Sequence, residues 1–227
     1  MKALYLLLNI GSFSIPFLYS FHPKMDFKKH WKALLTSTTL VAIIFIIWDY
    51  IFTLNGVWGF NSDYFLGPKF FNMPFEEVLF FFCIPYSSIF IHHALLYFLP
   101  SCQLKRGLTK GITLSLIVMA IMLMIIYYSR AYSFVAYMFL TLTLGIAWFK
   151  GLPLLDRFYI SFLIILVPFF IVNGILTGSF ILEPVVWYNN QENMNIRLFT
   201  IPVEDITYAF SMIFMNLMIM NKLENKL

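Results

Sequence analysis

The chain has 227 residues, of which 61% are hydrophobic, 20% aromatic and only 11% charged. Its mean hydropathy of +0.82 excludes a soluble domain of this length, whose outer surface must be wetted, and indicates a polytopic membrane protein. The formal charge of +4 belongs to the loops and implies no nucleic-acid partner. The two cysteines, Cys83 and Cys102, lack metal-site spacing and predict neither a disulfide nor a zinc ion.

Seven apolar segments can be drawn, each about 18 to 25 residues long, the length that crosses roughly 30 Å of hydrocarbon. The first resembles a signal peptide, but Pro16 and three aromatic residues follow it without an Ala-x-Ala-like cleavage site, so we expect a retained helix. The stretch 112–149 is too long for one crossing and predicts two helices joined tightly around Arg130. The predicted segments lie near 2–21, 32–54, 74–99, 110–128, 131–149, 158–177 and 202–220.

The distribution of Lys and Arg predicts the orientation. The side with the N-terminus and the connections after the second, fourth and sixth segments carries four of these residues, and the other side carries eleven. Because cytoplasmic loops are enriched in Lys and Arg, the richer side is expected to be cytoplasmic. The sequence therefore predicts a multi-pass protein of the cell (inner) membrane, with the N-terminus outside and the C-terminus in the cytoplasm.

Three motifs recur in the same order in the two halves of the chain. Trp48–Thr53 resembles Val172–Thr177, Gly56–Asn61 resembles Pro184–Asn189, and Pro74–Glu77 matches Pro202–Asp205. We therefore expect an all-α fold of two three-helix repeats, residues 1–100 and 130–227, joined by a spacer helix in 101–129. Because four crossings separate matching helices, the repeats run parallel, and corresponding residues are expected at the same depth in the membrane.

Each half carries a Pro-x-Glu-(Glu/Asp) motif that opens a spanning segment. The motif residues are Pro74, Glu76 and Glu77 in the first half, and Pro202, Glu204 and Asp205 in the second. The ordinary interpretation is capping, because proline and acids in the first turn suit the free N–H groups and the dipole of a helix. Duplication and aromatic neighbours favour a functional site instead. Two adjacent carboxylates in apolar surroundings cannot both ionise cheaply, so one is expected to keep a proton.

Aromatic residues surround both acidic pairs: Trp48, Trp58, Phe60, Trp187 and Tyr188. They have two interpretations. One is a belt at the membrane interface. The other is a lining whose π faces stabilise a carbocation, as they would any cation.

Three further polar residues accompany the motifs. Asp49 and Asn173 occupy matching positions and either hydrogen-bond the carboxylates or hold helices together. Arg197 precedes Pro202 by five residues. It either pairs with Glu204 or Asp205 or is a loop cation among the lipid headgroups.

The sequence lacks the residues that metal, nucleotide and retinal chemistry need. His22 and His30 lie in a basic loop, and His92 and His93 lie about 16 residues beyond Glu76, roughly 24 Å along the helix and so at its other end. Four scattered histidines do not build a di-iron site, and we expect no metal. The sequence has no Asp-rich diphosphate motif, no nucleotide-binding glycine motif and no lysine inside the last segment for a retinal Schiff base. Acid–base chemistry on an apolar substrate is what remains.

Together, these motifs resemble the small membrane lycopene cyclases. In some bacteria these enzymes are two short subunits, and in fungi the cyclase is fused to a phytoene synthase. The chain looks like the two subunits joined without the synthase. The resemblance covers nearly the whole length, but its specific motifs lie in about 45–82 and 170–210.

The resemblance implies a lycopene β-cyclase of the isomerase class, which closes the linear ends of lycopene or a related carotenoid into β-ionone rings without net redox change. It implies no flavin or other cofactor, and it leaves homo-oligomers open. One of the four motif acids would protonate the terminal alkene, and a carboxylate would later remove a ring proton. Replacing Glu76 or Glu204 by Gln is expected to abolish ring formation. The expected supporting residues are Trp48, Asp49, Trp58, Asn173, Trp187, Tyr188, Arg197, Pro74 and Pro202.

The alternative is a carotenoid or lipid carrier without catalysis, or a proton-coupled transporter with a parallel repeat. A transporter is expected to have helices broken near the middle of the membrane. Pro168 and Gly174 in the sixth segment are the only such hint, and the second segment has no matching break.

Overall fold

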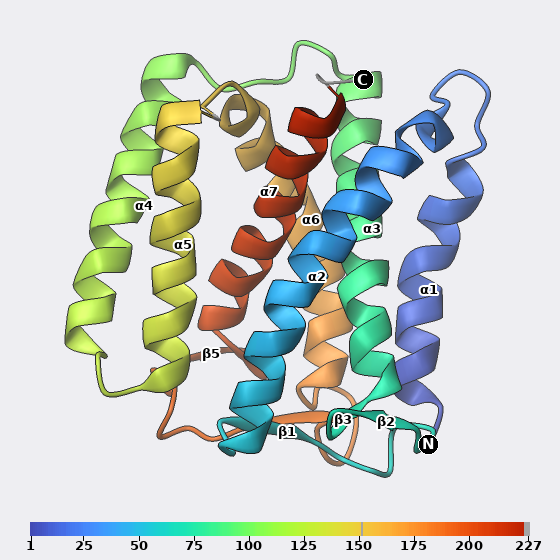
Figure 1. Ribbon diagram of the computed structural model, residues 1–227, viewed down its shortest axis with the longest axis vertical. Helices are drawn as coiled ribbons and strands as arrows, with labels where there is room; N and C mark the ends of the chain where they lie inside the picture. Colours follow the sequence, from blue (N-terminus) through green and yellow to red (C-terminus); the bar gives the residue numbers. More distant parts are fainter. Residues whose placement is uncertain (151, 225–227) are drawn as a thin grey trace.

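The computed structural model describes residues 1–150 and 152–224. Within these ranges seven α-helices stand side by side in one bundle (Figure 1). A short 3₁₀ helix, Phe27–His30, precedes the second of them. The helices are α1 (Leu4–Tyr19), α2 (Trp31–Leu54), α3 (Phe75–Phe98), α4 (Arg106–Ile126), α5 (Ala131–Lys150), α6 (Leu152–Leu176) and α7 (Glu204–Glu224).

The bundle has the surface of a membrane protein. Helices α2 to α7 are long and apolar enough to cross a membrane, whereas α1 is apolar but shorter. Large apolar side chains on the outside, such as Ile47, Ile125 and Leu163, are more than half exposed. Such a surface is stable against lipid and not against water. The predicted all-α polytopic membrane protein is therefore confirmed.

Several helix boundaries differ from the predicted segments, those of α1 and α6 among them. Helix α1 has 16 residues, fewer than the expected minimum, because the chain turns at Ser20, whose hydroxyl donates to the Pro16 carbonyl at 2.7 Å. Helix α6 begins at Leu152, six residues before the predicted segment. The charged residue Asp156 interrupts the apolar run but not the helix, where it forms an ion pair with Arg106 at 2.9 Å.

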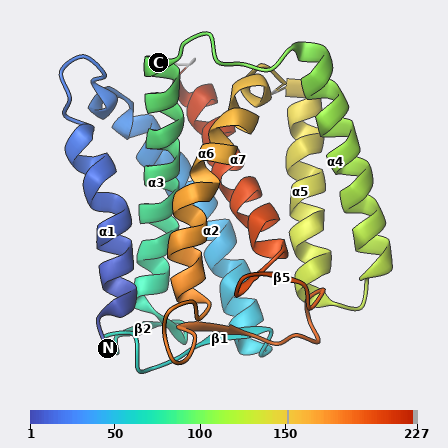
Figure 2. The same cartoon turned by 180° about the vertical axis from the view of Figure 1, so that it is seen from behind.

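Helices α2 and α6 lie on opposite faces of the bundle. Figure 1 has α2 in front, and the reverse view in Figure 2 has α6 in front. Helices α3 and α7 pack between them and against each other. Helix α1 packs on α3, α5 packs on α7, and α4 lies outermost beside α5. The starts of α3 and α7, which carry the acidic motifs, therefore meet in the middle of the bundle.

Short strands cover the end of the bundle at which α3 and α7 begin (Figure 1). They form three antiparallel pairs, β1 with β4, β2 with β3, and β5 with β6. The β1–β4 pair joins the loop before α3 to the loop before α7 and closes that end of the bundle. The strands are β1 (Trp58–Phe60), β2 (Lys69–Phe70), β3 (Met73–Pro74), β4 (Val186–Tyr188), β5 (Arg197–Leu198) and β6 (Ile201–Pro202).

The β1–β4 pair depends on a glycine. Gly59 is the register partner of Trp187, and a Cβ atom at position 59 would overlap the indole ring of Trp187. We expect Gly59→Ala to lower the free energy of unfolding by about 1–3 kcal/mol, the usual cost of overpacking. Thermal unfolding in detergent measures the change. Combining it with Trp187→Ala should recover most of the loss, and a neutral Gly59→Ala variant would show that the contact is not tight.

Candidate active site

One acid from each motif reaches a common cavity. The cavity lies at the centre of the bundle beneath β1 and β4, and its volume is about 60 Å³. Asp49, Glu77 and Asp205 all line it, from α2, α3 and α7. We call this cavity the acid chamber. Its other main polar or aromatic lining residues are Tyr5, Trp58, Phe60, Tyr132, Asn173, Tyr188 and Tyr208.

The motif prolines place these acids. Pro74 ends β3 and is the N-cap residue of α3, with φ −56° and ψ 144°, so the chain leaves a strand and enters a helix at once. Pro202 ends β6 just before α7. Both acids of each motif then fall in the first helical turn, where successive side chains point about 100° apart. One acid of each pair therefore faces the chamber and the other faces away from it.

Glu77 and Asp205 have different surroundings within the chamber. Glu77 accepts a hydrogen bond from the hydroxyl of Tyr5. Asp205 accepts from the hydroxyl of Tyr132, from Asn173 Nδ2 at 2.7 Å and from the hydroxyl of Tyr188 at 3.1 Å. Among the residues that the structure describes, three donors contact the Asp205 carboxylate, whereas a single donor contacts Glu77.

Asp49 is the third acid of the chamber, and its hydrogen-bond donors are close to it in the chain. Asp49 accepts hydrogen bonds from the indole N–H of Trp58 and, at 3.4 Å, from the Thr53 hydroxyl. Burial raises the pKa of Tyr188 well above its usual value, and the neighbouring Asp205 carboxylate raises it further. The Tyr188 phenol is therefore protonated at neutral pH and donates its hydrogen. No Lys, Arg or His lines the chamber among the described residues.

Glu76 and Glu204, the other motif acids, do not line the chamber. Both are fully buried. Glu76 accepts the backbone N–H of Leu66 at 2.8 Å, and Glu204 accepts that of Met194 at 2.7 Å. In each case the donor lies ten residues before the acid, in the loop that leads to the helix. We call these two residues the loop-anchoring acids. The structure thus brings together one acid of each pair and separates the two acids within each pair.

The other predicted residues divide between the chamber and its surroundings. Trp58, Asn173 and Tyr188 line the chamber, but Trp48 lies behind Trp58, with ring centroids 6.4 Å apart. Trp187 is partly exposed and lies over Gly59, outside the chamber.

Of the two interpretations of Arg197, pairing with Glu204 or Asp205 is wrong, because the side chain contacts loop acceptors instead. The guanidinium donates to the Thr200 carbonyl at 2.6 Å and to Asn190 Oδ1 at 2.8 Å. It also lies over the Tyr188 ring, 5.8 Å from the centroid. The reason is the β5–β6 hairpin, which pairs Arg197 with Pro202 and keeps the side chain in the loop layer.

Sequence reasoning missed the phenols that contact the acids. The Tyr5 hydroxyl donates a hydrogen bond to Glu77, and the Tyr132 hydroxyl donates one to Asp205. The two tyrosines are 127 residues apart (132 − 5). The sequence does contain a signal for these tyrosines, because they repeat near the ends of apolar helices with almost the same spacing as the acids. Ser133 was missed as well; its hydroxyl donates to Glu204 at 2.6 Å.

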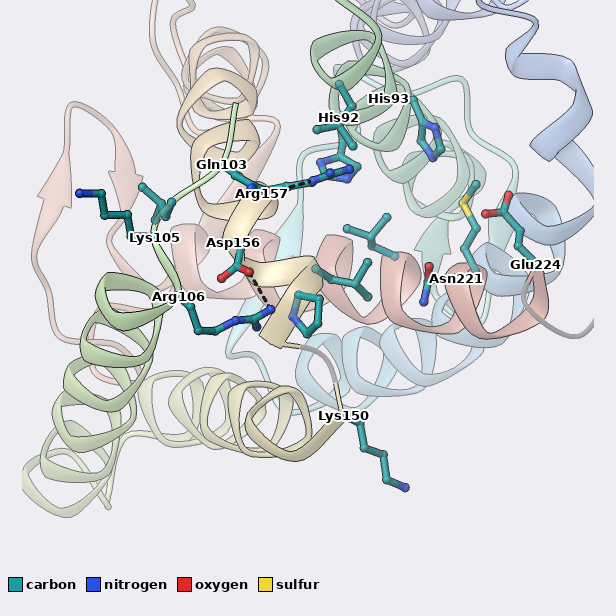
Figure 3. Close-up of a pocket in the computed structure, with 16 residues that line it drawn as sticks. His92, His93, Gln103, Lys105, Arg106, Lys150, Asp156, Arg157, Asn221 and Glu224 are labelled. Atoms are coloured by element: carbon teal, nitrogen blue, oxygen red, sulfur yellow. Dashed lines mark hydrogen bonds and ion pairs between the residues drawn. The ribbon is translucent and has the colours of Figure 1, made fainter. Parts of the chain in front are cut away.

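The histidines of α3 belong to a different cavity. His92 and His93 line a basin of about 670 Å³ at the opposite end of the bundle, with Arg106, Asp156 and Arg157 (Figure 3). His92 Nδ1 lies 2.7 Å from the Ser161 hydroxyl. His30, in the basic loop before α2, contacts Glu224. Within the described residues, no group of three or more His, Cys, Asp or Glu is placed to hold a metal ion.

Comparison with known proteins identifies the family to which the chain belongs. A protein-family model described as "Lycopene cyclase" matches residues 2–95 and 129–223, which is most of the chain and includes both acidic motifs. No curated protein and no solved structure gives a significant match. The matched regions contain α1, α2, α5 and α6 and all but the last residues of α3 and α7, and they leave out α4. The chain therefore belongs to the lycopene cyclase family and is a carotenoid cyclase of the membrane.

Proposed function

We propose that the chain is a lycopene β-cyclase that closes the linear ends of lycopene into β-ionone rings. The observation that carries the proposal is the meeting of Glu77 and Asp205 in one chamber with aromatic walls. The reaction needs a proton donor and a proton acceptor at one hydrocarbon end group, and two carboxyl groups can supply both. It forms one carbon–carbon bond and one ring without oxidant or reductant, so it is an isomerisation.

Glu77 is the proposed acid. It has one hydrogen-bond donor beside it, and no cation lines the chamber among the described residues, so repulsion from Asp49 and Asp205 favours its neutral form. Its proton adds to the terminal double bond of the substrate and leaves a tertiary carbocation. The electrons of the next reacting double bond attack this cation, which closes the ring and moves the positive charge onto a ring carbon.

Asp205 is the proposed base. Its three hydrogen-bond donors stabilise the carboxylate form, which can accept a proton from the carbon next to the cation. Loss of that proton gives the ring double bond and restores neutrality. The choice of carbon decides between a β and an ε ring, and we assign the β ring to a base held at a fixed position by these donors.

Aromatic side chains protect the cation in this proposal. Trp58, Phe60, Tyr132 and Tyr188 line the chamber, and a ring face attracts a cation by roughly 0.5–2 kcal/mol. The β1–β4 pair above them limits the access of water, which would otherwise capture the cation as an alcohol. The Arg197 guanidinium over the outer side of Tyr188 belongs to this cover.

We also propose that the protein consists of two parallel repeats, residues 1–100 and 130–227, joined by α4. Matching strands support this division, because β1 and β4, β2 and β5, and β3 and β6 begin 128 residues apart (186 − 58, 197 − 69, 201 − 73). The proposed orientation in the cell (inner) membrane has the N-terminus outside and the C-terminus in the cytoplasm, since four Lys and Arg residues lie on the first side and eleven on the second. The chamber then lies in the outer half of the membrane.

The test is conversion by the purified protein. Reconstituted in liposomes with lycopene and no added cofactor, the protein is expected to yield products of unchanged mass with one or two β-ionone rings. Chromatography with ultraviolet–visible and mass detection identifies them. Recovery of bound but unchanged lycopene would instead support a carrier, and an ε ring would overturn the assigned position of the base.

A further inference from the structure

An apolar groove adjoins the acid chamber on one side of the bundle. It runs between α1, α3 and α6, has a volume of about 450 Å³ and is lined almost entirely by apolar atoms. We call it the α1–α3–α6 groove. Its lining shares Phe80, Ile84, Phe169 and Asn173 with the chamber, so only these side chains lie between the two spaces.

The polar residues of the groove do not make it polar. The Ser12 hydroxyl donates to the carbonyl of Leu8 at 2.7 Å, and the Ser87 hydroxyl donates to that of Cys83 at 2.7 Å. These hydroxyls are satisfied by the helices themselves. What remains exposed along the groove is hydrocarbon, which favours an apolar occupant over water.

The corresponding position on the other side of the bundle is filled. There α2, α5 and α7 meet, and Trp48 stacks on Phe139 with centroids 4.8 Å apart and planes 11° apart. Tyr208 packs against Trp48 at 4.8 Å and against Phe45 at 5.0 Å. This group, which we call the aromatic plug, consists of Phe45, Trp48, Phe139 and Tyr208.

At two of the four plug positions the groove has a smaller residue. Tyr5 and Tyr132 match at an offset of 127 residues on α1 and α5, so Phe139 corresponds to Ser12. The match of Asp49 with Asn173 makes Val172 the counterpart of Trp48. Both Ser12 and Val172 line the groove. These two differences between the halves leave space for the groove on one side of the chamber, whereas aromatic rings fill the other side.

We propose that the α1–α3–α6 groove binds the linear polyene chain of the substrate and is its route from the bilayer to the acids. This inference rests on the proposed cyclase function. The chamber, at about 60 Å³, holds little beyond the reacting carbons, so the remainder of a long hydrocarbon needs another apolar space. The β1–β4 pair closes the loop side and the plug closes the α2–α5–α7 side. The groove contacts both the chamber and the lipid-facing side of α1, where Leu7 and Ile15 are exposed.

Gly11→Phe tests the proposal, with Gly111→Phe as the matched control. Both glycines lie in exposed helix positions, on α1 and α4, and a Cβ atom at either position meets no atom within 4 Å. The two changes therefore differ chiefly in that only Gly11 lines the groove. In liposomes we expect Gly11→Phe to lower kcat/KM for lycopene by about tenfold or more, and Gly111→Phe to stay within about twofold of wild type.

A binding measurement separates blocked entry from misfolding. The Glu77→Gln variant, purified from a lycopene-accumulating host, is expected to retain lycopene measurable by its visible absorbance. Adding Gly11→Phe should remove most of this pigment without lowering the midpoint of thermal unfolding, and adding Gly111→Phe should not.

Two failures remain distinguishable. If the wild type forms no ring, the proposed function fails. If the wild type forms rings while Gly11→Phe forms them as fast and retains as much pigment, the groove assignment is overturned and the cyclase function stands.

Discussion

Glu77→Gln is expected to lower ring formation by a factor of about 10²–10⁴, the range that a positioned acid or base contributes. Glutamine has the shape of glutamic acid but no acidic proton. Its amide oxygen can still accept the hydrogen bond from Tyr5, so the chamber should keep its geometry. Asp205→Asn is expected to cost a similar factor because an amide cannot accept the ring proton. The measurement is the rate of conversion per folded protein in liposomes.

The neighbouring acids supply the matched controls. Glu76→Gln and Glu204→Gln make the same chemical change one residue away, in the same helical turns, but outside the chamber. These two variants are expected to keep at least about a tenth of the wild-type rate, since the amide oxygen can replace the acceptor atom of each loop-anchoring acid. This reverses the expectation drawn from the sequence alone. Equal loss in Glu76→Gln and Glu77→Gln would contradict the assignment of Glu77 as the acid.

Deuterium incorporation from the solvent tests whether Glu77 is the proton donor. In D₂O the wild type is expected to place deuterium on the carbon that receives the proton, which the mass of the ring product reports. Glu77→Gln should leave lycopene without deuterium, because no proton is delivered. If Glu77→Gln still labels and cyclises the substrate at the wild-type rate, another group is the donor.

The meeting of the two motifs could be predicted because it depends on repetition. The same order and similar spacing of the motifs in both halves place Glu77 and Asp205 at one depth, and length and hydropathy locate the helices that carry them. Which acid of each pair faces inward could not be predicted. Adjacent residues in a helix point about 100° apart, and the rotation of the helix is set by packing against partners distant in sequence. Either choice places one carboxyl group of each pair in the chamber and leaves the sequence pattern unchanged.

The partners of the acids were hidden for a related reason. Tyr5 and Tyr132 lie near the ends of apolar helices, where tyrosine is common at any membrane interface. Their hydrogen bonds cross 72 and 73 residues of chain, so nothing local marks them. For Arg197 the sequence left two interpretations open, because proximity in sequence suggested a carboxylate partner, while the hairpin offers the carbonyl of Thr200 at 2.6 Å.

Glu204→Ala is expected to lower the free energy of unfolding by about 3 kcal/mol, because each buried donor left without a partner costs about 1–3 kcal/mol. The change orphans two donors, the Ser133 hydroxyl and the Met194 N–H. Glu76→Ala orphans the single N–H of Leu66 and should cost less. Thermal unfolding in one detergent compares them, with Leu114→Ala on the exposed face of α4 as the control.

The sizes of the losses identify their cause. Removing Ser133 as well, in Glu204→Ala with Ser133→Ala, eliminates one orphaned donor and should recover part of the stability, so the two changes should not be additive. If Glu204→Ala unfolds at the temperature of Leu114→Ala, the anchoring of the loop before α7 is not energetically important. The two acids of the second motif therefore differ in a measurable way. Glu204→Ala should lower the free energy of unfolding while each folded molecule keeps its activity. Asp205→Asn should lower the activity while its helix and loop remain folded.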